Sequence, residues 1–144
     1  MSITVEVART TTHELVDGLN YLVPQLSSSA TPLTADEVER MVQSPSLRLL
    51  VARNDDGIVG TLTLVLFEIP TGKRAIIEDV VVDEGARGLG VGEELTLRAV
   101  EIAKEFGVRS VDLTSRPSRV AANALYQKLG FEKRDTNVFR LNLN

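Results

Sequence analysis

The sequence predicts an α/β protein, an α+β fold in which helices cover the faces of one mixed sheet. Some segments alternate apolar and polar residues, as strands do, and others place apolar residues at helical spacing. These two kinds of segment alternate along the whole chain, and no linker or internal repeat divides it. We therefore expect residues 1–144 to form a single domain with the element order βααβββαβαββ.

The first third of the chain predicts a strand followed by two helices. Residues 3–7 alternate between apolar and polar side chains, as in a strand. Thr12 can cap a helix that continues to about Leu22 with apolar residues at helical spacing. Residues 34–37 fit a capping box, so a second, short helix begins there and ends before Pro45.

Three strands are expected next. Residues 47–53 and 58–67 flank a turn at residues 54–57, which is the pattern of an antiparallel hairpin. Residues 75–82 are nearly all apolar. We expect this third strand to be central and buried on both faces.

The second half of the chain predicts a strand–helix–strand unit. A glycine-rich turn at residues 85–92 precedes a long amphipathic helix, which Gly107 ends. Another strand follows at residues 108–114. The hairpins together with this unit predict a mixed sheet.

One more helix and a hairpin complete the expected fold. The helix spans about residues 119–129, with Ser118 as its N-cap and Gly130 at its C-terminal end. Residues 131–143 are expected to turn near Asp135 and form the final hairpin.

Composition excludes several classes of protein. With 43% hydrophobic and 25% charged residues, the chain is of the ordinary globular kind, and the absence of cysteine excludes disulfides, thiolate metal sites and a cysteine nucleophile. No apolar run approaches the roughly 18 residues of a membrane span, and the N-terminus does not resemble a signal peptide. We expect a cytoplasmic protein with no membrane partner and no metal.

The net charge of −4 is unevenly distributed. Residues 1–86 carry 6 Lys/Arg against 13 Asp/Glu, whereas residues 87–144 carry 10 against 7. This is too little positive charge for a nucleic-acid-binding protein. A small phosphorylated ligand is compatible with the second half.

A strand, a glycine-rich turn and a helix direct backbone N–H groups at an anion, although glycines also serve simply to shape tight turns. The turn lacks the Gly-Lys-Ser/Thr of a P-loop, and Glu93 stands where a dinucleotide-binding turn needs its third glycine. The spacing that fits is R-x-x-G-x-G, at Arg87, Gly90 and Gly92. Residues 124–131, Ala-Leu-Tyr-Gln-Lys-Leu-Gly-Phe, resemble the L-Y-x-K-x-G-F pattern. On these motifs the chain resembles the GNAT superfamily of acetyl-CoA-dependent N-acetyltransferases.

The resemblance implies acetyl-CoA as cosubstrate and an amine as acceptor. In this family the CoA pyrophosphate lies on the amides of the turn, and the pantetheine arm pairs with the preceding strand. The residues expected to contact the cofactor are Val80, Val81, Val82, Arg87, Gly88, Leu89, Gly90, Val91, Gly92, Asn123 and Tyr126. Many members carry Asn seven residues before the tyrosine, where this chain has Arg119, so Asn123 is the substitute contact. Whether Arg119 or Lys128 also contacts CoA stays open.

Acetyl transfer to an amine requires a base, and a proton for the departing thiolate. The resemblance makes Tyr126 the general acid. Glu78 and Asp79 are adjacent carboxylates in an apolar strand, where alternation would place them on opposite faces and burial would raise the pKa of such a group. We expect Glu78 to be the base, with Asp79 or a water as alternatives. Without cysteine, direct attack by the amine in a ternary complex is favoured.

The acceptor is expected to lie against Glu78, enclosed by residues 21–34 and residues 133–138. A small-molecule amine, including an amino-sugar phosphate, is the first candidate, and a peptide amine is the second. A non-catalytic acyl-CoA-binding domain is a further alternative. Isolated domains of this superfamily often form homodimers, and the sequence is compatible with one.

Overall fold

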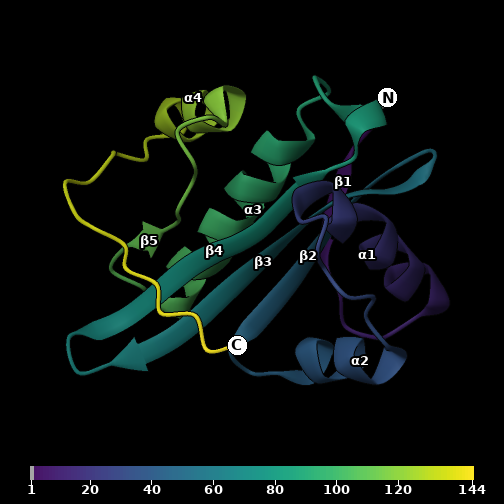
Figure 1. Ribbon diagram of the computed structural model, residues 1–144, viewed down its shortest axis with the longest axis horizontal. Coiled ribbons are helices and arrows are strands. Elements are labelled where there is room, and N and C mark those ends of the chain that lie inside the picture. The colour runs from purple at the N-terminus through teal and green to yellow at the C-terminus, as the bar shows by residue number, and fades with distance from the viewer. Residues whose placement is uncertain (1) are drawn as a thin grey trace. The chain divides into compact units, whose positions relative to one another are not determined.

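The computed structural model describes residues 2–144, which fall into two compact units (Figure 1). The first unit ends at Thr114, and the second comprises Ser115–Asn144. Within the described residues, the whole sheet and three α-helices belong to the first unit, and one α-helix belongs to the second.

The strands of the sheet lie side by side in their order along the chain. They are β1 (Thr4–Val7), β2 (Leu47–Asn54), β3 (Gly57–Ile69), β4 (Gly72–Val82) and β5 (Val111–Asp112). Neighbours are antiparallel except for β4 and β5, which are parallel. The predicted mixed sheet is confirmed, but β3 rather than β4 is its middle strand. β5 is also much shorter than the strand predicted at residues 108–114.

The helices of the first unit are α1 (His13–Leu26), α2 (Ala35–Gln43) and α3 (Val91–Phe106). Thr12 caps α1 by accepting a hydrogen bond from the Leu15 N–H at 3.1 Å, and Thr34 and Glu37 form the predicted capping box of α2. Gly107 ends α3 with a left-handed φ of 87°. No helix within residues 2–144 combines the length and apolar character needed to cross a membrane.

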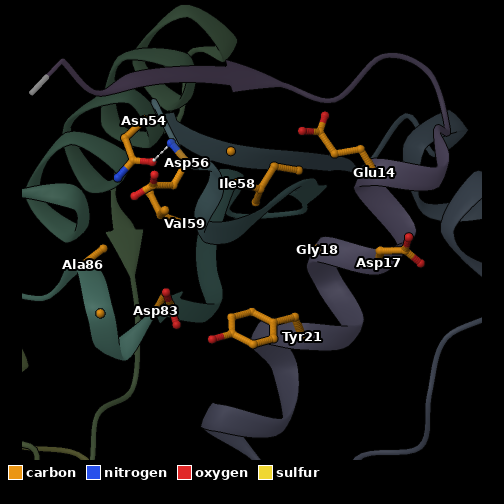
Figure 2. A pocket seen from close by; sticks show the side chains of 12 residues that line it. Glu14, Asp17, Gly18, Tyr21, Asn54, Asp56, Ile58, Val59, Asp83 and Ala86 are labelled. Carbon is orange, nitrogen blue, oxygen red and sulfur yellow. Dashed lines mark hydrogen bonds between the residues drawn. The ribbon is translucent and has the colours of Figure 1, made fainter.

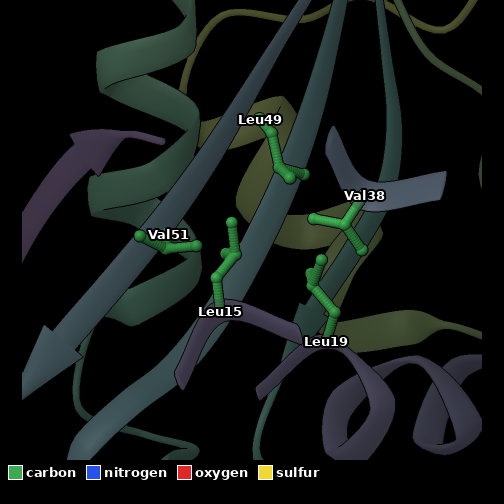
Figure 3. Close-up of a cluster of buried hydrophobic side chains, with 5 residues drawn as sticks. All are labelled: Leu15, Leu19, Val38, Leu49 and Val51. Atoms are coloured by element: carbon green, nitrogen blue, oxygen red, sulfur yellow. The ribbon is translucent and has the colours of Figure 1, made fainter. Parts of the chain in front are cut away.

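The two faces of the sheet pack against different helices (Figure 1). A Cβ atom at Gly60 would lie 2.8 Å from Val91 of α3, so the face that includes Gly60 packs against α3. The opposite face forms a buried aliphatic cluster with α1 and α2, which consists of Leu15, Leu19, Val38, Leu49 and Val51 (Figure 3). Each such side chain contributes about 1.5–3 kcal/mol by its burial.

The second unit contains α4 (Val120–Lys128). Gly130 follows the helix with φ 100°, which agrees with the predicted glycine end. The predicted N-cap is wrong: Arg119 occupies that position and makes no side-chain cap, while Ser118 accepts from the Val120 N–H through its carbonyl.

Residues 131–144 form no strand, so the predicted final hairpin is wrong. The proposed turn at Asp135-Thr136 lacks the glycine or asparagine that favours the positive φ of two-residue hairpin turns. An isolated pair of strands is also only marginally stable. After Phe131, the apolar side chains of this segment are exposed, at Val138, Phe139, Leu141 and Leu143.

Candidate active site

A β-bulge interrupts β4 beside the predicted carboxylates. Asp79 and Val80 together lie opposite a single residue of β3. Asp79 has a φ of 49°, a left-handed conformation that is uncommon for residues other than glycine. The regular alternation expected to place Glu78 and Asp79 on opposite faces is therefore interrupted at this point.

Glu78 pairs with Thr63 and shares its face of the sheet, the face that α1 and α2 cover. Both Glu78 and Asp79 are exposed, so their expected burial is wrong. The two carboxylates are exposed because β5 pairs with β4 only at Ala75 and Ile76. At residues 78 and 79, β4 therefore has no neighbouring strand on its outer side within the first unit.

The same short pairing leaves one edge of β4 free. Val81 and Val82 pair with β3 on their inner side, whereas within the first unit the strand has no neighbour beyond Ile76 on its outer side. A free strand edge presents backbone donors and acceptors to an extended, amide-containing ligand. Residues 80–82 therefore have the geometry expected for pairing with such a ligand.

The glycine-rich turn joins β4 to α3 after a short 3₁₀ turn, η1 (Glu84–Ala86). Gly88 and Gly90 have φ values of 82° and 84°, and a Cβ atom at either position would meet no heavy atom within 4 Å. The backbone conformation thus requires glycine at both positions, and the space beside them is open. Val91, by contrast, is buried and joins the start of α3 to the core.

The backbone N–H groups of residues 88–92 donate to no backbone carbonyl in the described part of the first unit. Gly90 is the N-cap of α3 and provides no side-chain cap for the first N–H groups, while Glu93 and Glu94 in the first turn place negative charge near the positive end of the helix dipole. Arg87 is exposed at the start of the turn. A phosphate group fits this combination of free donors, helix dipole and cation.

In the second unit, Tyr126 is the buried residue of α4, with 7% of its surface exposed. Its ring packs edge-on against Phe131, with 5.8 Å between the ring centroids. Burial raises the pKa of Tyr126 above its ordinary value, while the positive charge of Arg119 acts in the opposite direction. The phenol therefore keeps its proton at neutral pH, as a general acid must.

Asn123 of the same helix already has one structural contact. Its Nδ2 donates to the carbonyl oxygen of Arg116 at 3.0 Å and so ties the start of α4 to the preceding loop. Arg119 is exposed at the N-cap, and Lys128 is exposed at the last helical residue. The predicted cofactor contacts of these side chains stay predictions.

The sequence profile of the acetyltransferase (GNAT) family matches residues 16–131. The chain belongs to this family. A mycothiol acetyltransferase of Beutenbergia cavernae is 37% identical to this GNAT chain over 87 residues, which are 60% of this chain and 29% of the relative. A glucosamine 6-phosphate N-acetyltransferase of Trypanosoma brucei brucei is 37% identical over 89 residues, 60% of this chain and 58% of the relative. The chain therefore spans less than two thirds of either curated relative.

The GNAT fold is confirmed by a solved structure as well. The crystal structure of a Trypanosoma brucei acetyltransferase matches with a TM-score of 0.80 at 28% identity, and the match covers 99% of this chain and 100% of that one. Within this GNAT chain, the predicted base and phosphate turn lie on one continuous segment of the first unit, from Glu78 to Gly92. The predicted acid belongs to the second unit, on α4.

A cavity of about 510 Å³ lies in the first unit of this GNAT chain, between α1, the β2–β3 turn and the residues before the glycine-rich turn (Figure 2). Four carboxylates line it, from Glu14, Asp17, Asp56 and Asp83. Glu14 is paired with Arg53 at 2.6 Å. None of these residues was predicted as part of a site, and the acidic excess of residues 1–86 was the only sequence signal for them.

Among the described residues, no group of three or more His, Cys, Asp or Glu side chains is arranged to hold a metal ion.

Proposed function

We propose that this chain is an acetyl-CoA-dependent N-acetyltransferase that transfers the acetyl group directly to a primary amine of a small molecule. The observation that carries this proposal is the free edge of β4, which continues into a turn with unpaired amides at the start of α3. A strand edge is complementary to the amides of a pantetheine arm, and a cluster of N–H groups is complementary to a diphosphate. Membership of the GNAT family supports acetyl-CoA as the donor.

In this proposal residues 80–82 bind the pantetheine arm, and residues 87–92 bind the diphosphate. The open space beside Gly88 and Gly90 supports this assignment, because a diphosphate must approach the backbone closely. The exposed Arg87 guanidinium adds positive charge at the same place. Asn123 is proposed as a further contact to the pantetheine arm.

The proposed chemistry needs one base and one acid. The amine nitrogen attacks the thioester carbonyl carbon, the C–N bond forms, and the C–S bond breaks. Glu78 accepts the proton that the amine releases, directly or through a water molecule, and the neighbouring Asp79 is the alternative base. Tyr126 gives its proton to the departing sulfur, and the raised pKa of its buried phenol supports that role because the group is protonated beforehand.

The acceptor is proposed to be a small-molecule amine, including an amino-sugar phosphate. Two of the curated relatives, a mycothiol acetyltransferase and a glucosamine 6-phosphate N-acetyltransferase, support this class. A cationic peptide amine is the second candidate, because four carboxylates line the cavity beside α1. These four carboxylates and Glu78 belong to the same compact unit of the chain.

The proposal is tested by incubating the purified chain with acetyl-CoA and, separately, glucosamine 6-phosphate, spermidine and a lysine-containing peptide. Release of free CoA together with an acetylated product in the mass spectrum would support it, and the acceptor that reacts fastest identifies the class. Direct transfer predicts that the protein itself carries no acetyl group after free acetyl-CoA is removed. Binding of acetyl-CoA without transfer to any acceptor would instead indicate a non-catalytic binding domain.

A further inference from the structure

Gln25, near the end of α1, connects this helix to the residues that precede the glycine-rich turn. Its Nε2 donates to Asp83 Oδ1 at 3.1 Å, and its Oε1 accepts a hydrogen bond from the Glu84 N–H at 3.1 Å. Nε2 also lies 3.4 Å from the carbonyl oxygen of Tyr21, one turn earlier in the same helix. Both ends of the amide are therefore used, and the side chain is held against its own helix.

A second residue of α1, Tyr21, lies on the same side of Asp83. The Tyr21 hydroxyl points toward Asp83 (Figure 2), and hydrogen bonding to that carboxylate, followed by its negative charge, raises the pKa of Tyr21. Asp83 stands at the N-cap of η1, where an aspartate would ordinarily cap the following turn, but it makes no such bond. Its carboxylate is instead directed to α1.

The backbone transmits this contact to the turn. The Asp83 N–H donates to the Val59 carbonyl oxygen of β3 at 2.8 Å, and the Asp83 carbonyl oxygen accepts from the Ala86 N–H at 2.8 Å. Ala86 is buried, and the residue after it begins the turn. Residues 83–86 are thus fixed by β3 on one side and by Gln25 on the other.

We propose that Gln25 is a positioning residue for acetyl-CoA: it holds residues 83 and 84 so that the amides of residues 88–92 keep the orientation that a diphosphate needs. This inference rests on the proposed function and adds to it a residue of α1 that has no direct contact with the turn. Loss of the contact should weaken binding of CoA. It should leave the acetyl-transfer step at saturating acetyl-CoA nearly unchanged, because Glu78 and Tyr126 are not altered.

Four variants separate the hydrogen bonds from a simple effect of charge. Gln25→Ala removes both bonds without changing the charge, and we expect it to raise the Kd of CoA about three- to tenfold. Gln25→Glu places two carboxylates against each other and should weaken binding at least as much. Asp83→Asn keeps an acceptor for Nε2 and should bind as the wild type does. The double variant Q25E/D83N exchanges donor and acceptor in the bond between residues 25 and 83, while the Glu84 N–H can still donate to the side chain at position 25, and it should recover wild-type affinity.

Calorimetric titration with CoA measures the affinities, and hydrogen exchange of residues 84–92 in the unliganded chain reports the mobility of the turn. Gln43→Glu makes the same charge change at the end of α2 and should alter neither. Faster exchange and weaker CoA binding in Gln25→Ala, with kcat preserved and rescue in the double variant, would establish the role. Wild-type affinity in Gln25→Ala, or effects that simply add in the double variant, would refute it. If the wild-type chain itself binds no CoA, the proposed function fails. If the wild type binds CoA and Gln25→Ala binds it equally well, only the positioning role of Gln25 fails.

Discussion

Replacing Gly90 with alanine tests the anion-binding turn most directly. Gly90 has a φ of 84°, and an L-residue in this left-handed region costs about 1–2 kcal/mol. The new Cβ atom would meet no protein atom within 4 Å, so backbone strain is the whole cost for the unliganded chain. We therefore expect the free energy of unfolding to fall by about 1–2 kcal/mol.

The effect on CoA should be larger, because the methyl group would occupy the space that we assign to the diphosphate. Loss of one hydrogen bond to a charged group, about 1.5–3 kcal/mol, corresponds to a rise in Kd of about 10- to 150-fold. Gly107→Ala is the matched control. Gly107 has a φ of 87° at the other end of the same helix, and its Cβ atom would make only an ordinary contact with Lys73 at 3.9 Å.

Chemical denaturation and calorimetric titration with CoA give the two quantities for each variant. The two alanine variants should lose similar stability, while only Gly90→Ala should lose most of its affinity for CoA. If both variants bind CoA equally well, the turn does not hold the diphosphate and the assignment of residues 87–92 is wrong.

Four further predictions concern the acid, the base and the fold. Tyr126→Phe should lower kcat with little change in the Kd of acetyl-CoA, and an unchanged kcat in steady-state kinetics would contradict the general-acid role. Burial raises the pKa of Tyr126, so the protonated phenol stabilises the fold fully below the ordinary pKa of 10.0, and this stabilisation is lost as the pH rises through the folded-state pKa. The free energy of unfolding, measured against pH, should therefore fall at alkaline pH in the wild type by an amount that Tyr126→Phe does not show. Glu78→Gln should lower kcat more than Asp79→Asn does, and the opposite order in the same assay would identify Asp79 as the base. Thr34→Ala removes the N-cap of α2 and should lower the free energy of unfolding by about 1 kcal/mol in a denaturation experiment while CoA affinity stays unchanged.

The helices of the first unit could be predicted because their ends depend on local chemistry. Thr12 and Thr34 accept hydrogen bonds from residues three positions along the chain, and Gly107 adopts the left-handed conformation that ends α3. Such contacts leave a recognisable pattern within a few residues. The glycine-rich turn belongs to the same class, because its glycines are required by their own backbone angles.

The features that could not be predicted depend on pairing between distant segments. The bulge at Asp79 follows from a change of register between β3 and β4, and aspartate's tolerance of positive φ is only a weak signal for it. The short pairing of β4 with β5 exposes the carboxylates that an apolar strand seemed to bury. Gln25 and Asp83 are 58 residues apart, so nothing near either residue indicates their contact.

The contacts of Asp83 relate the uneven charge distribution of the sequence to the structure of the first unit. The acidic half ends with Asp83 and Glu84, only a few residues before the amides proposed to bind a diphosphate, and negative charge at that position would oppose binding. The hydrogen bond of Asp83 with Gln25 directs its carboxylate to α1, where it lines the acidic cavity. The same contact therefore turns the carboxylate of Asp83 toward the cavity and away from the backbone amides at the start of α3. Under the proposed function, this arrangement would attract an anionic cofactor and a cationic acceptor to adjoining parts of one unit.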